Sequence, residues 1–488
     1  MTSRAPAATK GEADPFVPIS KRQRLLVVAV FALFLILVLL ARSNDPTPVG
    51  DWIPTYLTLY VALLAAPFVL FRGAGWFHPV TFVALTSFVP LIQRFSVYGW
   101  GLDWHQVLPY RREELSELIE FQLLLNSLAI VSFYAGFFLT PKLPTPRFRF
   151  VDEPPGLVRK LILFSAFSFL VFVIFLAARG GLDAHIAGWA RGRHAEFTGQ
   201  HYKVALMSLG GLCCWIWLAF RRNALTSPAF WVCTGIALVI AFLSMGSRSS
   251  AIYPVFIGLI IWMLRERRVV YLPVFVGLLA AIYVVGALGA FRRSGWEGET
   301  RWDAATDVGV VDTITGGAEG EIARRSSSGD VALAIFARVP DDVPLLWGTT
   351  YLEALSAPIP RALWPGKPGQ VGGMAGRVFF GMQAGVPPGA VGEAYWNFHI
   401  PGVIVVFLLF GMFQNWMART YRRNADHRAA IVLYGSSLFL CSTPATAAFV
   451  GWIIPTSSLL FVFWILGILR LRRAQPTALH LRPTGLGA

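Results

Sequence analysis

The sequence is poor in charged residues, in cysteine and in metal-ligand patterns. Only 14% of its 488 residues are charged, whereas a soluble globular chain carries roughly 25%. The four cysteines all lie in apolar runs, without the spacing of a disulfide framework or a zinc site. The eight histidines also lack metal-ligand spacing. We therefore expect no metal and no other cofactor.

Apolar residues are abundant instead. They make up 55% of the chain, and the mean hydropathy is +0.58. One or two aqueous cores cannot bury so much apolar surface, so a bilayer must solvate part of it. The apolar runs are continuous and long enough to cross a hydrocarbon core of about 30 Å as helices, which excludes an alternating β-barrel.

We predict an all-α polytopic membrane protein with about 12 transmembrane helices and one large extracytoplasmic loop that contains short helices. The expected spans are 25–41, 53–71, 77–94, 117–139, 158–178, 203–220, 229–245, 250–264, 269–290, 400–418, 428–443 and 447–468. They define five segments. Residues 1–24 are expected to form a disordered cytoplasmic tail, 25–290 the first nine spans and 291–399 the extracytoplasmic loop. Residues 400–470 are expected to form three more spans and 471–488 a second cytoplasmic tail.

Basic residues orient these spans. Lysine and arginine gather at alternate connections, for example at Arg221, Arg265 and Arg419. Cytoplasmic connections carry such an excess, so both termini are expected in the cytoplasm. The same distribution accounts for the net charge of +15, and no nucleic-acid partner is expected.

Arginines at the opposite membrane edge are candidates for anion binding. Arg248 lies in the turn Ser244–Ser250, between two apolar runs. An arginine there costs about 2.5–3.5 kcal/mol unless it finds a partner, and a guanidinium binds phosphate bidentately. Arg292 and Arg293 close the ninth predicted span at the same edge. The alternatives are a turn arginine that reaches water and a pair of helix-end anchors.

The predicted loop holds a second group of candidates. Tyr351–Ala357 is expected to form a short amphipathic helix, and Pro358 and Pro360 are expected to stiffen the turn after it. The side chains that follow in this stiff segment include Arg361, Trp364 and Lys367. Aromatic rings beside cations suit a site for sugar faces and a phosphate, and the alternative is an interfacial belt that anchors the loop.

A third group precedes the tenth predicted span. Glu393 and Asn397 are four residues apart, so they share a face if this segment is helical. A carboxylate near several arginines suits a general base. It suits a structural counter-ion for Arg248 or Arg361 equally well.

Several of these segments carry a resemblance to a known family. The stretches IPRALWPGKP, WGTTYLEAL and GEAYWNFHIPGV, with the turn SMGSRSS and the segment GGLDAHIAGWARGR, resemble motifs of bacterial Wzy-type oligosaccharide repeat-unit polymerases. These O-antigen polymerases are related to the O-antigen ligases. The resemblance extends over residues 180–410.

The resemblance implies an extracytoplasmic glycosyltransferase of the bacterial inner membrane. Its partners would be the bilayer, a lipid-linked oligosaccharide on polyprenyl diphosphate, a chain-length regulator and a flippase. It would polymerise the repeat units into a surface polysaccharide, with polyprenyl diphosphate as the leaving group. The alternatives are an O-antigen-type ligase and a lipid-linked oligosaccharide flippase or transporter.

The resemblance also implies roles for individual residues. The expected catalytic residues are Glu393, His399 and Arg361. The expected diphosphate ligands are Arg248, Arg292, Arg293, Arg338 and Lys367, to which Arg361 would add. The expected sugar-binding residues are Trp364, Tyr351 and Asn397. Where the family often has Asn-Phe-Gly, this chain has Asn397-Phe398-His399, so His399 competes with Glu393 for the role of base and keeps the ligase alternative open.

Overall fold

A computed structural model describes residues 15–43, 52–71, 73, 75–99, 112–188, 201–245, 248–272, 274, 331–356, 359, 363–367, 369–381 and 385–469. Within these residues the chain is helical and forms no strand, only the isolated bridges Pro18–Gly75 and Phe150–Leu469. The all-α prediction is confirmed for this part of the chain.

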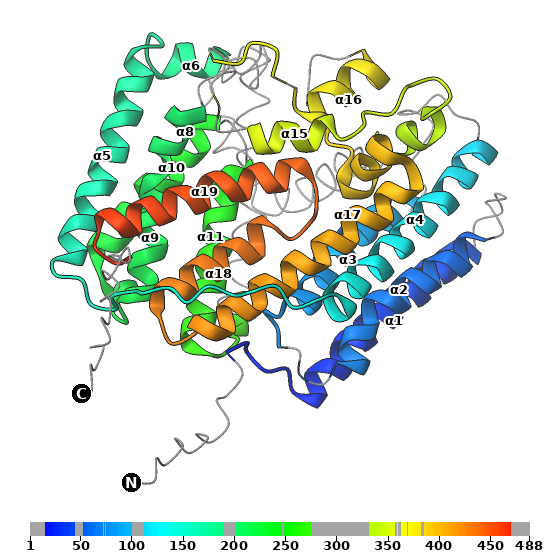
Figure 1. Ribbon diagram of the computed structural model, residues 1–488, viewed down its shortest axis with the longest axis horizontal. Helices are drawn as coiled ribbons and strands as arrows, with labels where there is room; N and C mark the ends of the chain where they lie inside the picture. The colour runs from blue at the N-terminus through cyan, green and yellow to red at the C-terminus, as the bar shows by residue number, and fades with distance from the viewer. Residues whose placement is uncertain are drawn as a thin grey trace, which may run out of the picture.

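The helices follow one another through the whole sequence (Figure 1). The first group is α1 (Lys21–Ser43), α2 (Ile53–Leu70), α3 (Pro79–Gly99), α4 (Arg112–Leu139), α5 (Leu157–Ala177), α6 (Leu182–Gly188), α8 (His201–Met207), α9 (Leu209–Phe220), the 3-10 helix η3 (Ala224–Thr226), α10 (Pro228–Met245) and α11 (Arg248–Glu266). The second group is a helix at 331–338, α15 (Thr349–Ser356), α16 (Val371–Phe380), α17 (Gly389–Asn424), α18 (Arg428–Leu440) and α19 (Thr446–Ile465).

Seven of the described helices are long and apolar enough to cross a membrane. A helix suits a bilayer because it satisfies its own backbone hydrogen bonds. Helices occupy each predicted span except 269–290, which lies almost entirely outside the described residues. The count of 12 and the division into tails, spans and loop stay predictions.

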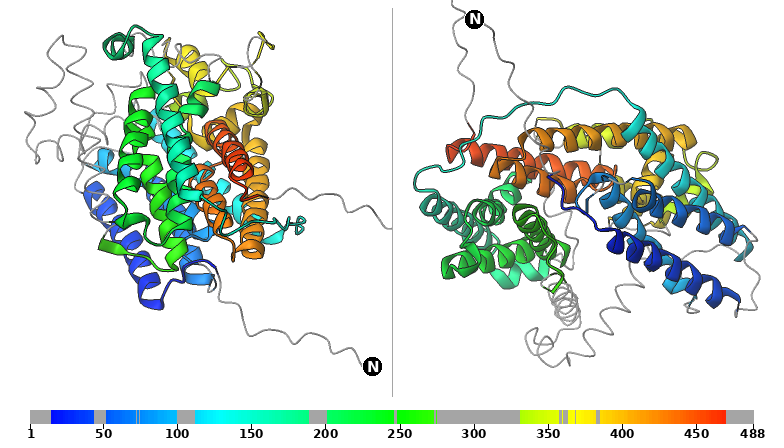
Figure 2. Two further views of the ribbon diagram at one scale, coloured as in Figure 1. Left: turned by 90° about the vertical axis from the view of Figure 1, so that its left-hand side faces the viewer. Right: turned by 90° about the horizontal axis from the view of Figure 1, so that it is seen from below.

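Helices α4 and α17 lie side by side although they are far apart in the sequence (Figures 1 and 2). Gly136 of α4 packs on the backbone of Leu408, and Gly411 of α17 packs on the backbone of Phe133. A Cβ atom at either glycine would overlap the facing backbone. Small residues permit this close approach between membrane helices.

One end of the bundle is held by arginine side chains that donate to backbone carbonyls of neighbouring segments. The bonds are Arg24 Nη1 to Phe71 O at 2.8 Å, Arg265 Nη1 to Arg221 O at 2.9 Å, Arg419 Nη1 to Leu143 O at 3.1 Å, Arg423 Nη1 to Thr145 O at 2.9 Å and Arg428 Nη1 to Phe220 O at 2.5 Å. We call this the arginine end. Its arginines satisfy carbonyls at and beyond helix C-termini that have no partner within their own helix.

The opposite end gathers short helices. Figure 1 shows α6, α15, α16 and the start of α17 along the edge of the molecule that lies away from the start of α1. We call this the short-helix end. Short segments of this kind were expected in the large loop, and α15 matches the helix predicted at Tyr351–Ala357 over its described residues.

Candidate functional site

The candidate site is built around a break in α17. Phe398 (φ −143°, ψ 19°) and His399 (φ 58°, ψ −151°) are not helical. Pro401 follows, and it has no N–H to donate to the carbonyl of Asn397. The break divides α17 into a first limb, 389–397, and a second limb, 400–424. The tenth span was predicted to start at residue 400, where the second limb begins.

The backbone conformation of His399 is one that glycine adopts readily and other residues adopt at a cost of about 1–3 kcal/mol. A glycine at this position would carry no such cost. The His399 Nε2 atom lies 2.7 Å from the Tyr395 hydroxyl, and the two rings are 4.4 Å apart. That contact holds the half-buried imidazole against the first limb.

A turn before α15 docks on the carbonyls that the break leaves open. Leu346 N–H donates to Trp396 O and Trp347 N–H donates to Asn397 O, each at 3.1 Å. Gly348 N–H donates to the side-chain oxygen of Asn397 at 2.9 Å. Gly348 has φ of 84°, and a Cβ there would lie 2.9 Å from the ring of Phe398. The break in α17 and the start of α15 therefore stabilise each other.

Asn397 is fully buried and its polar atoms are all engaged. Its Nδ2 donates to Thr350 Oγ1 and to Glu393 O, both at 2.8 Å. The second of these bonds confirms that Glu393 and Asn397 share one helical turn. The Asn397 side chain is 0% exposed, both of its Nδ2 protons are used and its Oδ1 already accepts one bond. Sugar binding by Asn397 stays a prediction, whereas its contacts with the start of α15 are seen directly.

Glu393 and Tyr351 lie close enough to interact electrostatically. Glu393 is 1% exposed. The Tyr351 hydroxyl oxygen is buried and has no hydrogen-bond partner among the described residues. Burial, and after it the charge of Glu393, raises the pKa of Tyr351 well above its usual value. The tertiary structure thus joins two residues that were predicted from separate segments.

Two more ionisable side chains are buried at the short-helix end. Glu353 on α15 is 5% exposed, and Lys367 is 7% exposed, with its Nζ 3.5 Å from Ile359 O. Together with Glu393 they are the only buried Asp, Glu, Lys or Arg side chains in the part of the chain that the structure describes. Lys367 was a predicted site residue, whereas Glu353 was missed. Its signal in the sequence is an acid within the otherwise apolar turn Tyr351-Leu352-Glu353-Ala354-Leu355.

The other predicted site residues are either partly exposed or lie outside the residues that the structure describes. The Arg338 side chain is 37% exposed, with its Nε 3.6 Å from Asp342 Oδ2 and its guanidinium 5.5 Å from the centre of the Phe379 ring. Trp364 is half-buried. Arg248 begins α11, but only its backbone is described, and Arg292, Arg293 and Arg361 lie outside the described residues. Diphosphate binding by these residues therefore stays a prediction.

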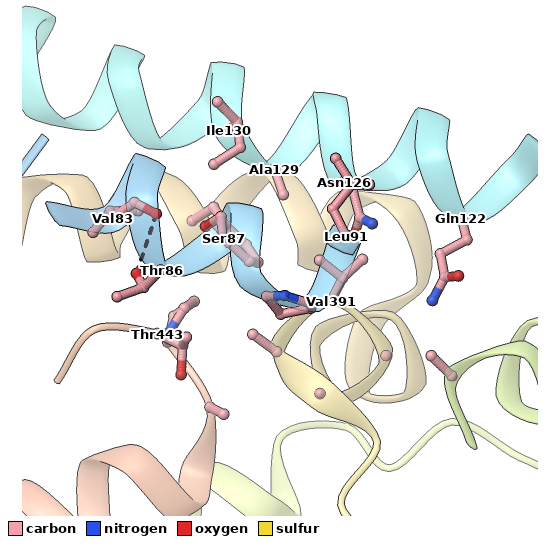
Figure 3. A pocket seen from close by; sticks show the side chains of 18 of the residues that line it. Val83, Thr86, Ser87, Leu91, Gln122, Asn126, Ala129, Ile130, Val391 and Thr443 are labelled. Atoms are coloured by element: carbon pink, nitrogen blue, oxygen red, sulfur yellow. Dashed lines mark hydrogen bonds between the residues drawn. The ribbon is translucent and has the colours of Figure 1, made fainter. Parts of the chain in front are cut away.

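A cavity lies between the first limb of α17 and helices α3 and α4. Its volume is about 300 Å³, and it is lined by residues of α2, α3 and α4, by Ala332, by both limbs of α17 and by the turn 442–445 (Figure 3). Pro388 and the first residues of α17 form part of its wall. It reaches Gly392, the residue before Glu393. Among the described residues, no group of three or more His, Cys, Asp or Glu side chains is placed to hold a metal ion.

Part of the chain matches a known protein family. A family model described as a domain of unknown function (DUF8712) matches residues 195–424. This range contains every predicted site residue and ends with α17, while α1 to α5 lie outside it. Searches of curated proteins and of solved structures find no match.

Proposed function

We propose that the protein polymerises oligosaccharide repeat units carried on polyprenyl diphosphate, at the outer side of the bacterial inner membrane. The observation that carries the proposal is the buried Glu393 side chain on the first limb of α17, before the break in that helix. Buried ionisable groups that interact electrostatically with a second such group, as Glu393 does with Tyr351, are typical of functional sites. The resemblance of the surrounding segments to Wzy-type polymerases supplies the reaction class.

In the proposed reaction, a hydroxyl of one lipid-linked repeat unit attacks the anomeric carbon of the growing chain. Glu393 accepts the proton of that hydroxyl, and a new carbon–oxygen bond forms. The bond between the anomeric carbon and the diphosphate oxygen breaks, and polyprenyl diphosphate leaves with the electron pair. Arg248 and Arg361 stabilise the developing charge on the diphosphate, with Lys367 in support.

The proposal is tested in cells that make a surface polysaccharide and depend on this protein for it. Arg361→Ala and Glu393→Gln should each leave single repeat units and no long chains, because charge stabilisation or proton transfer is lost. The matched controls are Arg377→Ala, on the exposed face of α16, and Glu266→Gln, at the arginine end. Long chains of normal length in both test variants, at normal protein levels, would overturn the proposal.

A ligase is the second candidate, and His399 favours it. Its imidazole is half-buried and is held through Nε2 by Tyr395, as a catalytic histidine is often oriented by a second group. The same experiment separates the two candidates. Loss of a ligase would leave long chains on polyprenyl diphosphate, whereas loss of a polymerase would leave single repeat units there.

A flippase has less support. Charged residues inside membrane spans mark transport pathways. Among the described residues, the buried acidic and basic side chains Glu353, Lys367 and Glu393 all precede residue 400, in the predicted loop, and none lies within a predicted span. Reconstitution in vesicles would test the alternative, since a polymerase should elongate its substrate without net translocation.

A further inference from the structure

The cavity beside α4 contains two carboxamides that the proposed reaction does not use. Gln122 and Asn126 are one turn apart on α4, and both line the cavity (Figure 3). Neither side chain makes a hydrogen bond to another described residue. On the α3 wall, Thr86 Oγ1 is already engaged, since it donates to Phe82 O of its own helix.

Most of the remaining wall is apolar, and Leu91, Leu123 and Phe407 are examples. None of the described residues that line the cavity carries a charge. A phosphate or a carboxylate would therefore enter without a counter-charge, which is costly in an apolar surrounding. A plain hydrocarbon chain would instead cover both carboxamides and leave their polar atoms unsatisfied. The wall selects a ligand that is uncharged and carries both hydroxyl groups and apolar surface.

We infer that this cavity binds one uncharged sugar ring. A carboxamide donates and accepts hydrogen bonds at the same time, as adjacent sugar hydroxyls require. The apolar wall suits the C–H face of the ring. The volume of about 300 Å³ is at the lower end of the range for ligand pockets, which fits one ring rather than an oligosaccharide. The ring would lie against the first limb of α17, on whose chain Glu393 follows Gly392 directly.

The inference deepens the proposed function, and only its biological meaning rests on that function. Under the proposed reaction, the cavity would hold an uncharged sugar of a repeat unit, apart from the groups that bind the diphosphate. Binding itself is measurable whether or not the protein is a polymerase.

The test uses the full-length protein in phosphatidylcholine nanodiscs. The probes are short-chain alkyl glycosides of glucose, galactose and N-acetylglucosamine that carry a diazirine next to the sugar. We expect at least one probe to label peptides from α4 and from the turn 442–445. Excess alkyl glycoside of the same sugar should suppress the labelling, whereas an alkyl sulfate of equal chain length should not.

Two variants make the result specific. The double variant Gln122→Met with Asn126→Leu removes both carboxamides at similar size, and Ala129→Leu fills the cavity but keeps them. Each should weaken binding by about tenfold or more, since several hydrogen bonds or the space for the ring are lost. Ala166→Leu, at an exposed position on α5, is the matched control and should label normally.

The inference is overturned if no probe labels the cavity, if the alkyl sulfate competes as well as the glycoside, or if the double variant labels normally. Thermal unfolding of each variant in the same nanodiscs identifies any that does not fold. Glu393→Gln separates the two proposals, because it should abolish chain elongation and leave the labelling unchanged.

Discussion

His399 combines a costly backbone conformation with a specific side-chain contact. Its φ of 58° is one that only glycine adopts without strain. Its imidazole meets the Tyr395 hydroxyl at 2.7 Å. The docked turn at Leu346–Gly348 and the missing N–H of Pro401 hold the break in place, so the strain at His399 persists in the folded protein.

Two substitutions at His399 distinguish the effect of the backbone strain from that of the side-chain contact with Tyr395. Both His399→Gly and His399→Ala remove the bond to Tyr395, but only glycine relieves the strain. We expect the glycine variant to be more stable than the alanine variant by about 1–2 kcal/mol, the reverse of their order within a regular helix. Thermal or denaturant unfolding in detergent measures the difference. An alanine variant at least as stable as the glycine variant would show that the break is not strained.

At the scale of elements, the pairing of α4 with α17 connects both candidate sites. Helix α17 carries Glu393 on its first limb, and α4 carries Gln122 and Asn126 on the wall of the cavity. The close approach of Gly136 and Gly411 sets the distance between the two helices. A change in this packing should therefore alter the shape of the cavity as well as the stability of the fold.

Gly136→Ala tests this packing. The new Cβ would overlap the carbonyl of Leu408, which cannot move without shifting α17. We expect the variant to lose about 3 kcal/mol of stability, the upper end of the usual cost of overpacking. Gly235→Ala on α10 is the matched control, because a Cβ there meets no atom within 4 Å. It should be neutral or stabilising by up to about 1 kcal/mol, since alanine favours a helix more than glycine does. Equal stability of the two variants would contradict the close packing.

At the scale of the whole molecule, the arginine end and the short-helix end differ in the kind of contact that their charged residues make. The arginine end closes helix termini with guanidinium–carbonyl bonds. The short-helix end contains the described acidic and basic side chains that are buried. The excess of basic residues at the first end predicts that it faces the cytoplasm and that the candidate site faces outward.

Cysteine labelling tests this orientation. Gly385→Cys places a thiol on an exposed residue before α17, and Asn223→Cys places one on an exposed residue between α9 and α10. The background has its four native cysteines replaced. In intact spheroplasts, a membrane-impermeant maleimide should label only the first variant, and it should label both after lysis. Labelling of the second variant in intact spheroplasts would show that the orientation is inverted.

The sequence by itself determined the all-helical class of the described residues and where most of their helices lie. Continuous apolar runs dictate helices because a bilayer leaves the backbone no other partner. The spacing of four residues put Glu393 and Asn397 on one face if their segment was helical, and the structure shows that it is. The predicted start of the tenth span at residue 400 is also where the second limb of α17 begins.

Only the tertiary structure decided which distant segments meet. Asn397 bonds to Thr350 and Glu393 acts on Tyr351 because α15 docks on the break of α17, and no local pattern encodes that docking. The carboxamides of Gln122 and Asn126 read as ordinary polar residues in the sequence. They become a candidate sugar site because α3, α4 and α17, which are far apart along the chain, pack around one cavity. Long-range packing depends on the fit of whole helix surfaces, which residue spacing alone does not specify.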